Sequence, residues 1–176
     1  IQGIHRDYIL RKPDLYPSYE SRWRQVMDYF PQARVYTGSY DAGKSIFSQP
    51  DSEFTQNAEE PQYDKDTWVF GVINDRIVHT KSQDELDDAI TLEESMGIML
   101  VSSREYNFMV SFQADERDLA PVQNQFPVIL KDQNGNTYDV FGNPVNNQQV
   151  DGLSYASSYF ALWWAWRDFY SNFLSF

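Results

Sequence analysis

The chain has 176 residues, of which 41% are hydrophobic and 16% aromatic, and it carries a formal net charge of −12 and no cysteine. This aromatic content excludes a disordered acidic tail, because such tails lack the large apolar side chains that offset ordering entropy. The negative charge would repel phosphate backbones, so we expect no nucleic-acid partner. The absence of cysteine excludes disulfides, thiolate chemistry and cysteine-ligated zinc. At this length one core is usual, and we expect a single domain over residues 1–176.

Two features of the chain bear on its location. It starts at Ile1 without a charged-then-apolar leader, which fits either a processed protein or a trimmed one. Its most apolar stretch, residues 155–176, is interrupted by Arg167, Asp168 and Asn172, whereas a membrane span needs about 20 predominantly apolar residues. We therefore predict no membrane span. We expect a periplasmic or secreted protein, with a cytoplasmic location as the alternative.

The first third of the chain contains one predicted helix. Apolar residues recur there at helical spacing, namely Trp23, Val26, Met27 and Phe30. This pattern predicts a helix over residues 18–30, which Pro31 ends. Residues 34–37 are expected to form a short strand, and residues 38–66 a long surface loop rich in Gly, Ser, Pro and acids.

The middle of the chain predicts a hairpin followed by a second helix. Residues 67–80 form two apolar runs around Asn74 and Asp75, which tolerate the positive φ of a tight turn. Ser82 and Glu85 then match a capping box, and Gly97 suits a helix end. A narrow apolar stripe lies between them, made of Leu86, Ala89 and Ile90. We expect a central acidic helix here.

The next segments predict an antiparallel sheet. Residues 98–101 are apolar, and residues 106–112 alternate between apolar and polar, the pattern of a half-buried strand. Residues 126–131 and 137–141 are joined by a loop containing Asn-Gly, which favours a further hairpin.

The chain closes with an aromatic helix, which we expect to begin near Ser157 or Ser158 and to pack on the sheet. Its broad face would contain Tyr159, Leu162, Trp163, Trp166, Phe169, Tyr170 and Phe173. The expected fold class is therefore α+β, with a mostly antiparallel sheet, an N-terminal helix, a central acidic helix and a C-terminal aromatic helix.

The string from Gly38 to Ser45 matches the P-loop pattern of Gly, four residues and Gly-Lys-Ser. A working P-loop runs into a helix whose amides face the phosphates, but Pro50 follows closely and no helical stripe is present. We interpret the string as an ordinary turn. Nucleotide binding is kept as the less favoured alternative.

Two patterns could suggest metal or histidine chemistry. Residues 132–136 begin like a calcium-binding loop, but Thr137 and Asn143 stand where Gly and Glu are required, so we expect a polar hairpin turn and no metal. The only histidines are His5 and His79. His79 lies on a predicted strand, where a core or solvent position is favoured over a catalytic one.

Acidic residues are concentrated in three runs, at 59–66, 84–94 and 115–118. Such runs are usually solvated surfaces. A carboxylate-dependent hydrolase stays open as an alternative, and it requires two acids in one pocket with separated pKa values.

The last third of the chain contains an ordered set of motifs, namely Phe126-Pro127-Val128-Ile129-Leu130-Lys131-Asp132, Gly135 to Pro144, Gly152-Leu153 and Tyr159 to Tyr170. In order and spacing they resemble the strands, glycine turns and aromatic helix of the domain of unknown function 3179, a bacterial family. More loosely, residues 23–40 and 69–74 are similar to earlier family segments. Many members also carry a Tyr-Cys-Pro-Xaa-Cys segment, which this chain lacks at residues 98–112.

The resemblance brings no established activity. With no cysteine and few histidines, we expect a non-enzymatic binding or accessory domain outside the cytoplasm, without a cofactor, whose partner is an unidentified small molecule or protein. A ligand cleft would be bordered by the glycine turns and the aromatic helix. The predicted ligand-binding residues are Tyr138, Gly142, Gly152, Trp163 and Trp166.

Overall fold

The computed structural model describes residues 21–35, 62–114 and 116–176. Its elements, in chain order, are α1 Trp23–Tyr29, β1 Trp68–Asn74, β2 Ile77–Ser82, the 3-10 helix η3 Gln83–Glu85, β3 Thr91–Ser95, β4 Ile98–Ser103, β5 Phe108–Gln113, β6 Ala120–Pro121, β7 Val128–Lys131, β8 Thr137–Asp139, β9 Ser157–Leu162, α2 Trp163–Phe169 and β10 Phe173–Ser175. The α+β class with mostly antiparallel sheets is confirmed. The P-loop-like string at 38–45 lies outside the described residues.

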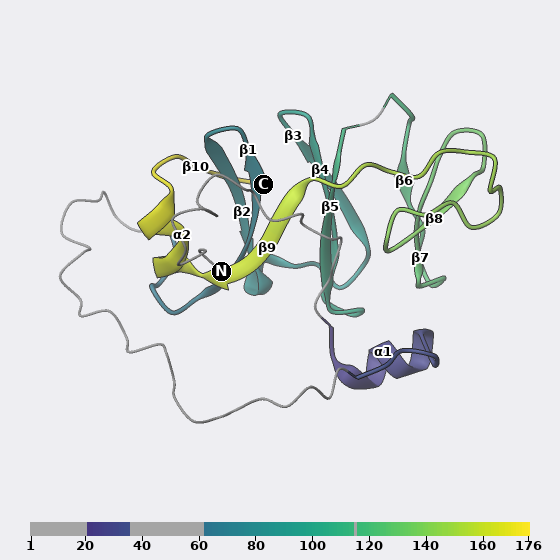
Figure 1. The fold of residues 1–176 in the computed structure, drawn as a ribbon, viewed down its shortest axis with the longest axis horizontal. Helices are drawn as coiled ribbons and strands as arrows, with labels where there is room; N and C mark the ends of the chain where they lie inside the picture. Colours follow the sequence, from purple (N-terminus) through teal and green to yellow (C-terminus); the bar gives the residue numbers. More distant parts are fainter. Residues whose placement is uncertain (1–20, 36–61, 115) are drawn as a thin grey trace, which may run out of the picture.

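The strands form three sheets. Sheet A has the order β10-β2-β1-β9, sheet B the order β3-β4-β5, and sheet C the order β6-β7-β8. All pairs are antiparallel except β10 with β2. Along the long axis of the molecule, α2, sheet A, sheet B and sheet C follow one another, and α1 lies to one side (Figure 1).

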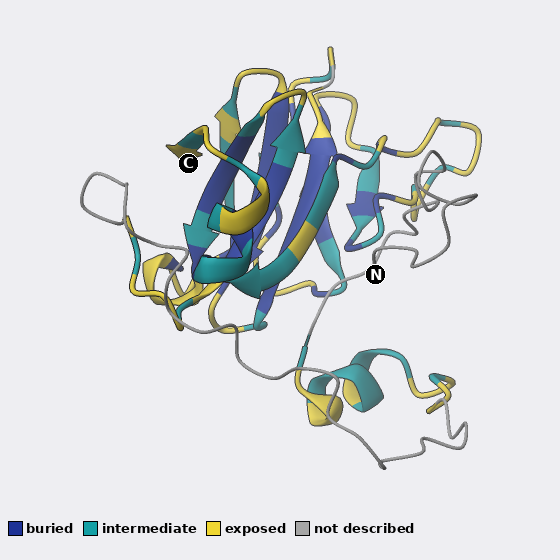
Figure 2. Ribbon diagram, turned by 60° about the vertical axis from the view of Figure 1, so that its left-hand side comes forward, coloured by how far each residue is buried: buried dark blue, intermediate teal, exposed yellow. Residues whose placement is uncertain are grey.

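Sheet B is the centre of the core because both of its faces are covered. Met99, Val101 and Val110 belong to the cluster shared with sheet C, whereas Leu100 and Met109 belong to the cluster shared with sheet A. The alternating pattern at 106–112 predicts a half-buried strand, but β5 is buried on both faces up to Ser111 and Phe112, because sheet A covers the second face, that of Met109 and Ser111. Figure 2 shows the central strands as continuous buried ribbons.

Residues 154–156 bond sheet B and lead directly into sheet A. Gln113 N donates to Ser154 O at 2.7 Å, and Ala156 N donates to Ser111 O at 3.1 Å, so residues 154–156 bond the free edge of β5. The chain then continues as β9, which pairs with β1 over six residues. The edge strand β9 of sheet A therefore continues directly from a segment that is bonded to sheet B.

The predicted central acidic helix is wrong. Ser82 and Glu85 do form both hydrogen bonds of the capping box, but only the three-residue η3 follows them. The chain then forms β3, which pairs with β4 across a two-residue turn at Met96 and Gly97, with φ of 47° and 83°. The local capping signal started one turn of helix, and pairing of the following residues with β4 in the next hairpin determined the rest.

The C-terminal helix is shorter than predicted. Residues 157–162 form β9 because they pair with β1, and the helix occupies only Trp163–Phe169. Of the predicted helix at 18–30, Trp23–Tyr29 is confirmed as α1, whereas residues 18–20 lie outside the described residues. Both predicted hairpins are confirmed as β1–β2 and β7–β8. Arg34 and Val35 lie outside any strand, and the rest of that predicted strand is outside the described residues.

Candidate functional site

Trp163 and Trp166 form the contact between α2 and sheet A, as predicted for a helix packed on the sheet. Trp166 is 1% exposed, its Nε1 donates to Val69 O at 3.1 Å, and its ring stacks on Tyr159 at a centroid distance of 4.2 Å. Trp163 is also buried, between Tyr63 and Phe173. Both side chains belong to the hydrophobic core, and neither offers a free face to a ligand.

Tyr138 lies in sheet C within a buried polar network. Its hydroxyl donates to Asp132 Oδ2 at 3.2 Å and accepts from Arg117 Nη1 at 2.9 Å. The guanidinium also lies over the Tyr138 ring, 5.1 Å from its centroid. Arg117 donates further to Asp151 O at 2.7 Å, so this network ties the 144–152 loop to sheet C.

Gly142 and Gly152 meet at a close backbone contact. A Cβ at Gly142 would lie 2.8 Å from the Phe112 ring, and one at Gly152 would lie 3.0 Å from Gly142 O. Gly142 O also accepts from Leu153 N at 2.9 Å. These glycines allow two chain segments to touch, so the contact explains them without a ligand.

The five predicted site residues therefore fall into two groups. Tyr138 and the two glycines lie around sheet C, whereas Trp163 and Trp166 lie in the cluster on the outer face of sheet A. Sheet B stands between the two groups (Figure 1). The structure thus brings the first three residues together but does not join them to the aromatic helix in one cleft.

A repeated aspartate turn is a feature that the sequence prediction missed. Asp132 Oδ1 accepts from the backbone N–H groups two and four residues later, both at 2.9 Å, and Asp139 Oδ1 does the same at 2.8 and 2.9 Å. Each turn has Gly at its fourth position with positive φ and Asn at its fifth. The signal was Asp-x-x-Gly-Asn, present twice seven residues apart.

The first of these turns confirms the predicted polar hairpin turn at 132–136. The side-chain hydrogen bond from Asn136, followed by backbone N–H groups and the Tyr138 hydroxyl, holds the pKa of Asp132 below its usual range. Its carboxylate oxygens are thus occupied by donors of the fold. Among the described residues, Asp132 is the only buried acid, so they do not supply the pair of buried acids that a carboxylate hydrolase needs.

His79 is buried in β2, at 0% exposure, which agrees with a core position. Its ring lies 5.4 Å from that of Phe176, and neither ring nitrogen has a hydrogen-bond partner. Burial lowers the pKa of His79, so the neutral form is favoured in the folded protein. The described residues also include no group of three His, Asp or Glu placed to hold a metal ion.

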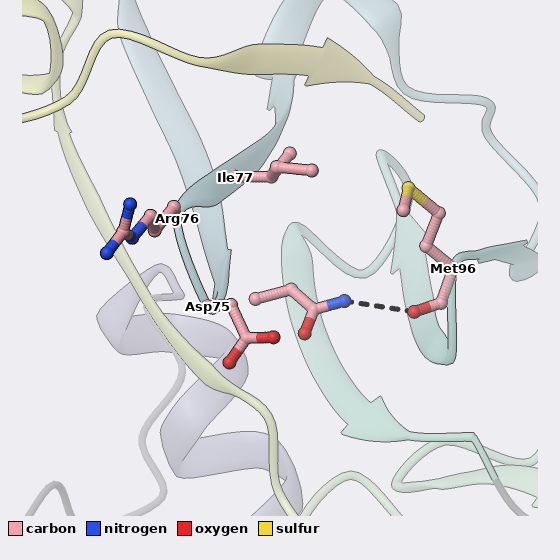
Figure 3. Close-up of a pocket in the computed structure, with 5 residues that line it drawn as sticks. Asp75, Arg76, Ile77 and Met96 are labelled. Atoms are coloured by element: carbon pink, nitrogen blue, oxygen red, sulfur yellow. Dashed lines mark hydrogen bonds between the residues drawn. The ribbon is translucent and has the colours of Figure 1, made fainter.

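A shallow depression lies between the turns of the β1–β2 and β3–β4 hairpins (Figure 3). It is lined by Asn74, Asp75, Arg76, Ile77 and Met96. Asn74 Nδ2 donates to Met96 O at 2.9 Å, which joins the two turns, and the Arg76 side chain points away from Met96. These residues offer no set of groups converging on a ligand.

The outer edge of sheet A is the more informative surface. Trp163 N donates to Thr67 O at 2.9 Å, and bonded pairs alternate along an antiparallel ladder. From the register of β9 on β1, Tyr159 and Ala161 therefore bond β1, while the backbone groups of Ser158, Phe160 and Leu162 point away from it. Within the described part of the chain, no strand pairs with this side of β9.

The side chains along this edge are uncharged and partly exposed. No residue of Ser157–Leu162 carries a charge at neutral pH, and Tyr159 is 39% exposed while Trp68, opposite Leu162, is 53% exposed. Burial raises the pKa of Tyr159 further above neutrality. β9 thus lacks the charges, prolines and bulges that usually block the edge of a sheet.

Across residues 21–35, 62–114 and 116–176, no helix has both the length and the apolar character needed to cross a membrane. No protein-family model matches the chain, and neither a curated protein nor a solved structure matches it significantly. The resemblance of residues 126–170 to the domain of unknown function 3179 stays a prediction.

Proposed function

We propose that this protein is a non-enzymatic binding domain that pairs with an extended polypeptide segment along β9. The observation that carries the proposal is the open edge of sheet A, where the backbone of Ser158, Phe160 and Leu162 points away from β1. Such an edge offers alternating donors and acceptors to an added strand, and its neighbouring side chains provide selectivity. The resemblance and the absence of cysteine favour a location outside the cytoplasm.

The surroundings of β9 suit this role. Sheet A is rigid beneath the edge, because Tyr159 stacks on Trp166 and Phe160 packs against Phe70 at a centroid distance of 5.0 Å. The exposed Trp68 lies on the same face as Leu162, its cross-strand partner. An added strand would therefore meet a fixed backbone ladder with apolar side chains on both faces.

Replacement of a single outward N–H tests the proposal. Ser158→Pro removes the N–H that points away from β1 and leaves the bonds to β1 intact, whereas Ser158→Ala keeps that N–H and is the matched control. The probe is a random peptide library displayed on phage, selected on the wild-type protein. We expect enriched peptides to bind wild type and Ser158→Ala but to lose binding to Ser158→Pro.

Hydrogen exchange provides an independent measurement. A bound peptide should slow exchange of the amides of Phe160 and Leu162, which lack a partner in sheet A. If no peptide is enriched on a monomeric chain, or if enriched peptides bind both Ser158 variants equally, β9 is not the binding edge and the proposal fails.

A further inference from the structure

We infer that the segment that pairs with β9 is β9 of a second copy of this chain, antiparallel and related by a two-fold axis at Phe160. This inference rests on the function proposed above and names the partner at that same edge. Three observations carry it: the positions of the outward backbone groups, the absence of charge along the edge, and the exposed apolar side chains beside it.

The outward backbone groups are symmetric about Phe160. A two-fold axis there places Phe160 opposite Phe160 of the second copy, and Ser158 opposite Leu162 of the second copy. The backbone groups of all three residues point away from β1, so each of these N–H and C=O groups finds a partner in the second copy without a register shift. Such an interface is isologous, with the same patch used twice. Sheet A would then continue from one copy into the other.

Charge favours this occupant. The chain carries a formal charge of −12, so most surfaces of two copies would repel each other. The edge is an exception, because neither Ser157–Leu162 nor the opposing Trp68–Ile73 contains a charged residue. Two copies can therefore meet here without opposing like charges, whereas a basic peptide would gain no ion pair from the strand itself.

The side chains along the edge are also self-compatible. Phe160, Leu162 and the exposed Trp68 share one face of the sheet, and Tyr159 and Ala161 share the other. In the two-fold arrangement, Tyr159 lies opposite Ala161 of the second copy, a large side chain facing a small one. Pairing would bury apolar surface of Trp68 and Tyr159 that is exposed in the single chain.

Opposite charges at the two-fold axis provide the test. Phe160→Lys and Phe160→Glu each place like charges directly opposite each other in the dimer, and a mixture of the two places opposite charges there. By analytical ultracentrifugation, we expect wild type to dimerise and each variant alone to associate at least about tenfold more weakly. The equimolar mixture should recover a dimer containing one copy of each variant. Circular dichroism checks that both variants are folded.

Ser158→Pro leaves Phe160 in place and serves if either Phe160 variant fails to fold. It should also weaken self-association, whereas Ser158→Ala should not. A wild-type chain that is monomeric at its highest soluble concentration would overturn the inference, as would a dimer that none of these substitutions weakens. If the chain is monomeric but library peptides still require the Ser158 N–H, the proposed function stands and only the second copy is refuted.

Discussion

The contact between Gly71 and Trp166 leads to a strong prediction about stability. A Cβ added at Gly71 would lie 2.3 Å from Trp166 Cζ2 and 2.6 Å from two further atoms of the same six-membered ring. Ordinary carbon contacts are about 3.5–4.0 Å, so in Gly71→Ala the indole must move by more than about 1 Å. That movement also strains the hydrogen bond from Trp166 Nε1 to Val69 O.

The expected cost follows from these two effects. Overpacking costs about 1–3 kcal/mol, and the weakened hydrogen bond about 0.5–1.5 kcal/mol. We therefore expect Gly71→Ala to lower the free energy of unfolding by about 2–4 kcal/mol and the melting temperature by about 5–15 °C. Urea unfolding and a thermal scan would measure the two quantities.

A double-mutant cycle separates this steric explanation from a general effect of the substitution. Trp166→Phe is itself destabilising, but it replaces the bicyclic indole by a single ring and so removes the outer ring that the new methyl would meet. In the Trp166→Phe background, Gly71→Ala should cost at least about 1 kcal/mol less than in the wild type, because neighbouring sites that clash are not additive. Equal costs in the two backgrounds would refute the reasoning.

Two further predictions concern the turns and the core histidine. Gly142→Ala should lower the free energy of unfolding by about 1–3 kcal/mol more than Gly135→Ala, as measured by urea unfolding. Both glycines have positive φ, but only the Cβ at Gly142 would meet the Phe112 ring, at 2.8 Å. Equal costs would show that backbone strain alone is responsible. Since burial depresses the pKa of His79, the unfolded chain binds more protons below about pH 6.5, and stability should fall as the pH is lowered from about 7.5 to about 5.5. His79→Phe should flatten this part of the profile of melting temperature against pH, and an unchanged slope would contradict the assignment.

The sequence predicted those elements whose signals are local. The β1–β2 hairpin follows from two apolar runs around residues that tolerate positive φ, and Asp75 does have a φ of 54°. The polar turn at 132–136 follows in the same way from its Asp and Asn-Gly. In each case the residues that give the signal also make the contacts that form the element.

Elements whose strand partners the sequence signals did not identify were predicted poorly. Ser82 and Glu85 indicated a helix start correctly, but Gly97, which was interpreted as a helix end, lies in the tight turn through which Thr91–Ser95 pairs with β4. The aromatic face from Tyr159 to Phe173 satisfied helical spacing, yet its first part is a short apolar run with aromatic residues, which also suits a strand. Pairing with β1 decided between these two, and residues 157–162 became β9.

The same reasoning explains why the predicted site residues do not form one cleft and why we propose another surface. Glycines and aromatics were expected to border a cleft, but Gly142 and Gly152 are required by a backbone contact and Trp166 by the packing of α2. Residue types cannot distinguish those roles from ligand binding. The open edge of β9 depends instead on which backbone groups point away from β1, a property of strand register that exists only once the sheet has formed. Its uncharged composition was visible in the sequence, but it bears on our proposal only because β9 is the outermost strand of sheet A among the described residues.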